Sequence, residues 1–317
     1  MDQWVTAASS LLAFLLYYNT LDAGFVYDDR RAILSNPDVI GHTPIKALFE
    51  NDFWGTPLTD PGSHGSYRPL CVATYRLNYA FGGFKPWSYH FLNVLFHSTA
   101  TALVVITAKR LLPTYCLKVG TVVTGVSFAA HPIHTEAVAG IVGRADLAAC
   151  NFFLLSFLLY TEHLRIRNKS RRQCRDSYKQ VLPRSIEGED QNFRLSCHGL
   201  VQQLLTNFRK LLKASKSGPL KVLNVCEVHE AVQLNKCQCS GCASEDAGEF
   251  LQWCTLVGTL LFATAATLCK EPAIMVVPLC ILYDLLKDFR QEEPFSKKTS
   301  LFETANATRI TTSTNNR

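Results

Sequence analysis

A pair of adjacent carboxylates, Asp28 and Asp29, comes directly after an apolar stretch that begins near Trp4. Further ionisable residues lie beside other apolar stretches, and they carry both signs of charge. They are Arg68, His131, His134, Glu136, Arg144, Asp146, Lys270 and Glu271. A carboxylate accepts or orients a hydroxyl proton, whereas histidine, lysine and arginine stabilise a leaving phosphate. Together these groups favour transfer of a sugar from a lipid phosphate to an alcohol.

Six apolar stretches supply the elements that must position these groups. They are Trp4–Tyr18, Phe91–Leu112, Val119–Ala130, Ala137–Tyr160, Phe250–Leu268 and Ala273–Leu286. We interpret them as about six membrane-spanning helices, although several are shorter than the ~20 residues that cross a bilayer. A large soluble protein with buried helices is the alternative, because mean hydropathy is only +0.07. Two long polar loops account for that low mean, so we expect an all-α polytopic membrane protein.

Lysine and arginine predict the orientation of these helices. Basic residues follow the second, fourth and sixth stretches: Lys109, Arg110 and Lys118; Arg165, Arg167, Lys169, Arg171 and Arg172; Lys287, Arg290, Lys297 and Lys298. These turns therefore belong on the cytosolic side. The acid-rich loop 19–90 and the other ionisable groups then converge on the lumenal side, which argues for one lumenal reaction site. A cleaved signal peptide over Met1–Thr20 is an alternative, but it lacks a basic amino-terminal region.

The chain accordingly divides into four regions. Residues 1–163 form a transmembrane region with the lumenal loop 19–90. Residues 164–249 form a cytosolic loop, partly disordered, in which Phe193–Ala214 has the spacing of an amphipathic helix. That helix suits an anionic lipid surface or packing against other loops. Two further helices occupy 250–290, and a polar tail at 291–317 is expected to be disordered.

Each polar cluster also has a purely structural explanation. Asp28 could pair with Arg30 or Arg31 in the loop. His90, Asn93 and His97 share one helical face and could simply pack against another helix, while His131 and His134 could shape a turn. Their combination favours function, because an ionisable residue in hydrocarbon costs ~2.5–3.5 kcal/mol on insertion scales.

Four segments resemble the TMTC family, the transmembrane and tetratricopeptide-repeat proteins of the endoplasmic reticulum. They are Val26–Asp29, Ser66–Leu70, Tyr89–His97 and the long ungapped string His131–Asp146. The resemblance covers residues 10–160 well and the Lys270-Glu271 region more loosely.

The resemblance implies the amino-terminal part of a glycosyltransferase C-type fold and a dolichyl-phosphate-mannose-protein mannosyltransferase. Its implied donor is dolichyl-phosphate mannose, and its acceptors are serine or threonine residues of lumenal, cadherin-like proteins. In that fold the first lumenal loop carries a catalytic acidic pair, which implies that Asp28 is the base or the residue that orients the nucleophile, with Asp29 supporting it. Donor-phosphate and mannose binding is implied for the other candidates, Arg68, His131, His134, Glu136, Arg144, Asp146, Lys270 and Glu271. The implied location is the endoplasmic reticulum membrane.

No cofactor is expected, and the resemblance implies no metal, although Asp, Glu and His together could hold one. Cys237, Cys239 and Cys242 lie near His229, but three cysteines without a second matching pair are a weak zinc signal. The expected partners are the lipid-linked donor, lumenal acceptor proteins and membrane lipids. Nucleic acid is not expected, because the basic residues are scattered among acids. Asn306 fits the glycosylation pattern but lies on the predicted cytosolic side.

Family members continue with more membrane helices and tetratricopeptide repeats of about 34 residues, which this sequence does not show. We therefore expect a short isoform or a fragment. A truncated, inactive member acting as a membrane scaffold or partner is the main alternative function. A transporter is the other, but it would place ionisable groups near mid-membrane rather than at one edge.

Overall fold

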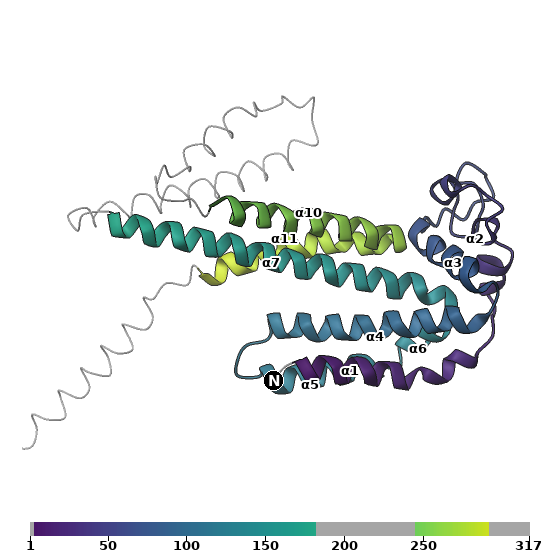
Figure 1. Ribbon diagram of the computed structural model, residues 1–317, viewed down its shortest axis with the longest axis horizontal. Helices are drawn as coiled ribbons and strands as arrows, with labels where there is room; N and C mark the ends of the chain where they lie inside the picture. The colour runs from purple at the N-terminus through teal and green to yellow at the C-terminus, as the bar shows by residue number, and fades with distance from the viewer. Residues whose placement is uncertain (1–2, 182–244, 292–317) are drawn as a thin grey trace, which may run out of the picture. The chain divides into compact units, whose positions relative to one another are not determined.

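The computed structural model describes residues 3–181 and 245–291, and within them it is helical without a β-strand (Figure 1). The chain falls into two compact units, residues 1–164 with 253–317 and residues 165–252. In the second unit, the described residues are helix ends, where Gln252 Nε2 donates to Ser170 Oγ at 3.3 Å. The predicted amphipathic helix 193–214, the cysteine cluster at 237–242, Asn306 and the tail lie outside the described residues.

Three helices, α1 (Gln3–Leu16), α4 (Pro86–Leu111) and α5 (Leu117–Ala130), pack against one another. Their contact depends on small residues, and Gly125 of α5 is the tightest point. A Cβ atom at Gly125 would lie 2.3 Å from Ser9 Oγ and 2.8 Å from a methyl carbon of Val105. The glycine therefore lets the three backbones approach closely, as small residues do between membrane helices.

A second group of helices contains α7 (Arg144–Val181), α10 (Glu245–Cys269) and α11 (Val276–Gln291). Within the first unit these helices share an apolar cluster of Phe157, Ala263, Val276 and Cys280. Ser156 of α7 also donates to the Thr259 carbonyl of α10 at 2.9 Å. The 3₁₀ turn η6 (Glu271–Met275) joins α10 to α11 and carries the Lys270-Glu271 pair to the end of this group.

The six apolar stretches all coincide with helices, but only three helices in the described part of the chain are long and apolar enough to span a membrane. They are Pro86–Leu111, Ile141–Gln173 and Gly248–Cys269. Helix α5 has 14 residues, which is about 21 Å, against a hydrocarbon core of about 30 Å. Three apolar helices indicate a membrane protein, and six spans remain a prediction.

Two predicted helix boundaries differ from the structure. The stretch Ala137–Tyr160 is broken into α6 (His134–Ala139), a 3₁₀ turn η4 (Ile141–Gly143) and α7. Gly140 has an extended backbone and ends α6. Helix α7 then continues to Val181, well beyond the predicted boundary at residue 163. The break places Arg144 at a helix start rather than inside a continuous helix.

The predicted loop 19–90 contains several helical elements that sequence patterns did not indicate. They are η1 (Tyr18–Asp22), η2 (Arg30–Leu34), α2 (Pro37–Ile40), η3 (Ile45–Phe49), α3 (Pro69–Gly82) and the first turn of α4. Their side chains share a buried core that includes Ile33, Phe53, Tyr75 and Tyr89. The loop is therefore a folded layer, and Ile141 and Ala145 from outside the loop contribute to the same core.

Asp52 holds one end of this layer together. Its carboxylate is buried and accepts four hydrogen bonds of 2.7–3.0 Å, from Ser63 Oγ and from the amides of Trp54, Thr56 and His64. Burial alone would raise the pKa of Asp52, but these hydrogen bonds outweigh it and lower the pKa below its ordinary value. The ionised carboxylate is thus a structural part of the layer.

Candidate active site

Asp29 ties the folded loop to the break between α6 and α7. Its side chain is buried, with one carboxylate oxygen accepting from the Val26 amide at 2.9 Å and the other from the Val142 amide at 3.2 Å. Burial raises the pKa of Asp29, and the two backbone hydrogen bonds and the nearby His90 offset part of that effect. Both carboxylate oxygens accept hydrogen bonds from the backbone, so Asp29 holds the loop in position.

Asp28 lies in the opposite environment. It is exposed, and its carboxylate has no hydrogen-bond or ion-pair partner among the residues that the structure describes. The alternative pairing with Arg31 is not seen there, because Arg31 lies over the Trp54 ring at 5.7 Å. The preceding Tyr27 has a φ of +39°, a costly conformation for a residue with a side chain. The turn therefore presents Asp28 outward beside its buried neighbour.

Arg144 is wholly buried, and its guanidinium is surrounded by neutral hydrogen-bond acceptors. Its Nε donates to Asn93 at 2.9 Å, and Nη1 donates to Asn78 at 2.6 Å and Thr74 at 3.2 Å. Nη2 donates to the Tyr89 carbonyl at 2.9 Å. The rings of Tyr75 and Tyr89 lie 4.6 and 5.6 Å from the guanidinium carbon. This arrangement favours a positioning role over the predicted contact with a donor phosphate.

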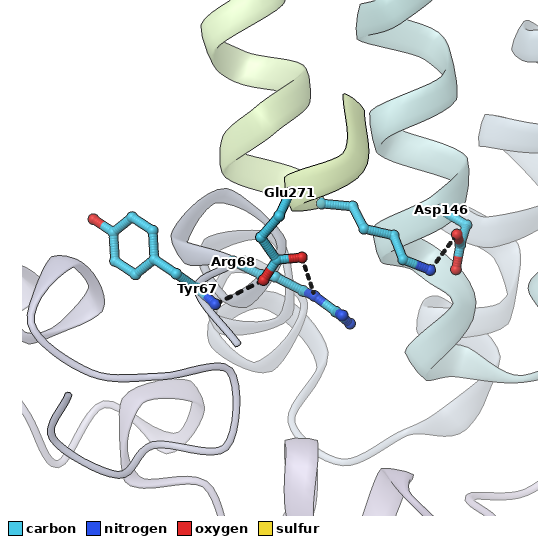
Figure 2. A network of polar contacts seen from close by, with 5 residues as sticks. Tyr67, Arg68, Asp146 and Glu271 are labelled. Atoms are coloured by element: carbon cyan, nitrogen blue, oxygen red, sulfur yellow. Dashed lines mark hydrogen bonds and ion pairs between the residues drawn. The ribbon is translucent and has the colours of Figure 1, made fainter. Parts of the chain in front are cut away.

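The Lys270-Glu271 pair makes the most exposed network among the candidates (Figure 2). Glu271 accepts a hydrogen bond from the Tyr67 amide at 2.9 Å, and its other carboxylate oxygen lies 3.5 Å from Arg68 Nε. Lys270 forms an ion pair with Asp146, two residues beyond Arg144 in α7. The structure thus brings together four predicted candidates, Arg68, Asp146, Lys270 and Glu271, from three separate elements.

The histidine motif forms a separate group. The His134 ring lies 4.4 Å from the Phe128 ring and 5.0 Å from the His97 ring, and burial together with the nearby His131 lowers its pKa. His131 and Glu136 are exposed. In the part of the chain that is described, no hydrogen bond or ion pair joins this group to Asp28 or Lys270, and no cluster of three or more His, Cys, Asp or Glu residues could hold a metal.

This sequence is similar to several proteins named protein O-mannosyl-transferases. It is 42% identical to Tmtc2 of Drosophila melanogaster over 277 residues, which are 87% of this chain and 21% of that protein. It is 59% identical over 158 residues to Tmtc1 of Drosophila melanogaster, covering 50% of this chain and 18% of that protein. Human TMTC2 is 55% identical over 164 residues, 52% of this chain and 19% of its own length. This chain belongs to the TMTC family.

The match is to the amino-terminal portion of these TMTC proteins. The chain spans about a fifth of the length of the curated relatives it matches, since it covers 21%, 18% and 19% of the three named above. No family model matches the chain, and no solved structure matches it. The family is therefore established by the relatives alone.

Three residues of this TMTC chain take part in the site without having been foreseen as members of it. Thr74 and Asn78 of α3 and Asn93 of α4 all accept hydrogen bonds from Arg144. Asn93 was recognised only as part of a polar helix face. Thr74 and Asn78 are four residues apart, the spacing of one helical face, and this spacing is the one sequence signal that could have indicated them.

Proposed function

We propose that this chain carries the lumenal reaction site of a protein O-mannosyltransferase of the endoplasmic reticulum, with six membrane spans and a glycosyltransferase C-type fold. The names of the relatives, protein O-mannosyl-transferases, support mannosyl transfer in general. The observation that carries the assignment to a residue is the exposed Asp28, whose carboxylate has no partner among the described residues, beside the buried Asp29. Helices α1, α5 and α11 would complete their spans with flanking polar residues buried in protein.

The proposed reaction moves mannose from dolichyl-phosphate mannose to a serine or threonine hydroxyl of a lumenal protein. Asp28 accepts the hydroxyl proton as the hydroxyl oxygen bonds to the anomeric carbon. The bond from that carbon to the phosphate oxygen breaks, and dolichyl phosphate leaves with the electron pair. Arg68 and Lys270 are the accessible cations for the leaving phosphate, since each has a partly exposed side chain held by a carboxylate.

Substitution of Asp28, with Asp22 as a control, tests this proposal. The chain and its variants are expressed in cells without endogenous activity, and mannose on lumenal threonines is measured by mass spectrometry. We expect Asp28→Asn to reduce transfer by about 10²-fold or more without lowering the unfolding temperature. Asp22→Asn is the matched control, because Asp22 is another exposed aspartate of the same loop; its transfer should be unchanged.

Two results would contradict the proposal in different ways. Undiminished transfer by Asp28→Asn would remove the catalytic assignment while leaving the enzyme class intact. No transfer by the unaltered chain, in cells where a full-length relative is active, would instead favour the membrane-scaffold interpretation. The unfolding temperature of each purified variant separates both results from misfolding.

A further inference from the structure

Helix α3 has two faces of opposite character. Its inner face carries the buried Tyr75 together with Thr74 and Asn78, which accept hydrogen bonds from Arg144. Its outer face carries Leu77 and Phe81, whose exposed fractions are 59% and 89%. These outer residues are four apart, so they lie one above the other on the helix.

Two further exposed aromatic side chains follow α3 directly in the chain. Phe84 in the connecting turn and Trp87 in the first turn of α4 are also exposed, by 41% and 52%. We call Leu77, Phe81, Phe84 and Trp87 the apolar face of α3. A single exposed apolar side chain needs no explanation, but several large ones so close together in the chain indicate a contact surface.

The outer side of α3 lacks the polar surface of a helix that faces water. Its inner side packs Cys71 and Val72 into the core and turns Thr74 and Asn78 toward Arg144, while its largest exposed side chains are apolar. A surface helix in water carries polar side chains on its outer side. The environment on the outer side is therefore less polar than water.

The connection to α4 places this face at a membrane surface. Helix α4 is one of the three described helices that can span a bilayer, and only residues 83–85 separate it from α3. The joint is braced, because Asn78 Nδ2 donates to the Ser88 carbonyl at 3.2 Å and the Tyr89 hydroxyl donates to the Gly83 carbonyl at 3.2 Å. Helix α3 has 14 residues, about 21 Å. It is too short to cross the bilayer itself.

The residues at the joint are those typical of a lipid interface. Trp87 stacks on Phe91 of the same helix, with ring centroids 5.1 Å apart and planes 8° apart. Tryptophan is enriched at the level of the lipid headgroups. Lys85 is exposed beside it, and a lysine near a helix end extends its ammonium toward the headgroups.

We propose that the apolar face of α3 lies in the interfacial layer of the bilayer, where lipid glycerol and upper acyl groups cover it. Its partner is a lipid surface, and the inference does not depend on the proposed mannosyl transfer. Because Arg68 directly precedes α3 and Asn78 holds Arg144, lipid contact would fix the height of both arginines above the membrane.

Photocrosslinking identifies the partner directly. p-Benzoylphenylalanine is placed at position 81 in the full chain, which is reconstituted in phosphatidylcholine nanodiscs, irradiated and analysed by mass spectrometry. Leu58 is the matched control position, since it is a 40% exposed apolar residue of the same loop that is not part of this face. We expect severalfold more lipid adduct at position 81 than at position 58.

Three outcomes would overturn the proposal. Adducts at position 81 to a second copy or to another protein would show that the face binds protein. Equal lipid yields at positions 81 and 58, or no adduct at position 81 despite a folded sample, would show that the face is not specifically in lipid. The probe replaces a side chain that is 89% exposed, so the variant is expected to fold.

Discussion

Arg144 and Lys270 are both cations, and the family resemblance implies donor-phosphate binding for both, yet their surroundings are opposite. Arg144 is wholly buried and donates to neutral groups from α3 and α4. The side chain of Lys270 is 30% exposed, and its ion-pair partner Asp146 is 50% exposed. A buried guanidinium with so many fixed acceptors is part of the framework. A half-exposed ion pair is weak enough to exchange its carboxylate for another anion.

The neighbouring aspartates repeat this contrast one residue apart. Asp29 has both oxygens occupied by backbone amides, whereas Asp28 is exposed and carries no such bonds within the described chain. In each comparison the buried member positions the site and the exposed member is available to a ligand. Mutations can test this division between buried residues that position the site and exposed residues that bind a ligand.

Replacing Arg144 should have the largest effect on stability. Arg144→Met removes the donor shared by the partly buried Asn78 and the buried Asn93 and Tyr89 carbonyl. Each unsatisfied buried group costs about 1–3 kcal/mol, so we expect a loss of about 3 kcal/mol or more in the free energy of unfolding. Chemical unfolding in mild detergent measures it. Lys270→Met is the matched control and should cost far less; equal costs would contradict the comparison.

The backbone that presents Arg144 should be nearly as sensitive. A Cβ atom at Gly143 would lie 2.4 Å from the Ala137 carbonyl oxygen and 2.6 Å from the Ala137 Cα, and backbone atoms cannot rotate away. Gly143→Ala should therefore destabilise by about 1–3 kcal/mol. Gly24→Ala, where nothing lies within 4 Å of the added atom, provides the control in the same unfolding assay. A stable Gly143→Ala variant would show that the break between α6 and α7 is adaptable.

Sequence patterns predict the parts of this fold that depend on local hydrophobicity. All six apolar stretches form helices, although one is broken at Gly140. Sequence patterns do not indicate helix α3, because it has apolar side chains both in the core and on its exposed side and so lacks the one-sided pattern of a helix in water. A short apolar run within a polar loop carries little signal.

The sequence indicates which ionisable residues the candidate site contains, but it does not indicate which of them are buried. The partners of Arg144 lie 51–70 residues away along the chain, in α3 and α4, so no local pattern reveals that they enclose it. Asp28 and Asp29 are identical in type and adjacent. Only the turn at Tyr27 decides which carboxylate faces inward.

The buried carboxylates should differ in the sign of their pH dependence. The lowered pKa of Asp52 contributes stability that is present above its unfolded-state pKa and is lost as pH falls through the folded value. The raised pKa of Asp29 contributes stability that is present at low pH and is lost as pH rises through the folded value. In a plot of stability against pH, Asp52→Asn should thus reduce the loss of stability as the pH falls. Asp29→Asn should reduce the loss of stability as the pH rises through the folded-state pKa of Asp29.

The unfolding temperatures of the two variants and of the unaltered chain are measured between about pH 3 and pH 7, a range that includes the ordinary aspartate pKa. At neutral pH, Asp52→Asn should also cost about 1 kcal/mol for its weakened hydrogen bonds. Parallel profiles for all three proteins would show that neither carboxylate titrates with folding.

The smallest effect belongs to the exposed ion pair. A double-mutant cycle with Lys270→Ala and Asp146→Ala should give a coupling free energy of about 0.2–1 kcal/mol, as for other solvent-accessible pairs. Raising the ionic strength to about 1 M should reduce it further, because the Debye length falls to about 3 Å. The matched cycle, Arg144→Met with Asn78→Ala, should be larger and insensitive to salt, since Arg144 is wholly buried and Asn78 is uncharged. A large, salt-independent coupling between Lys270 and Asp146 would make the pair as fixed as the Arg144 contacts. Lys270 could then not release Asp146 for a phosphate, and the division between framework and ligand site would fail at the residue on which it most depends.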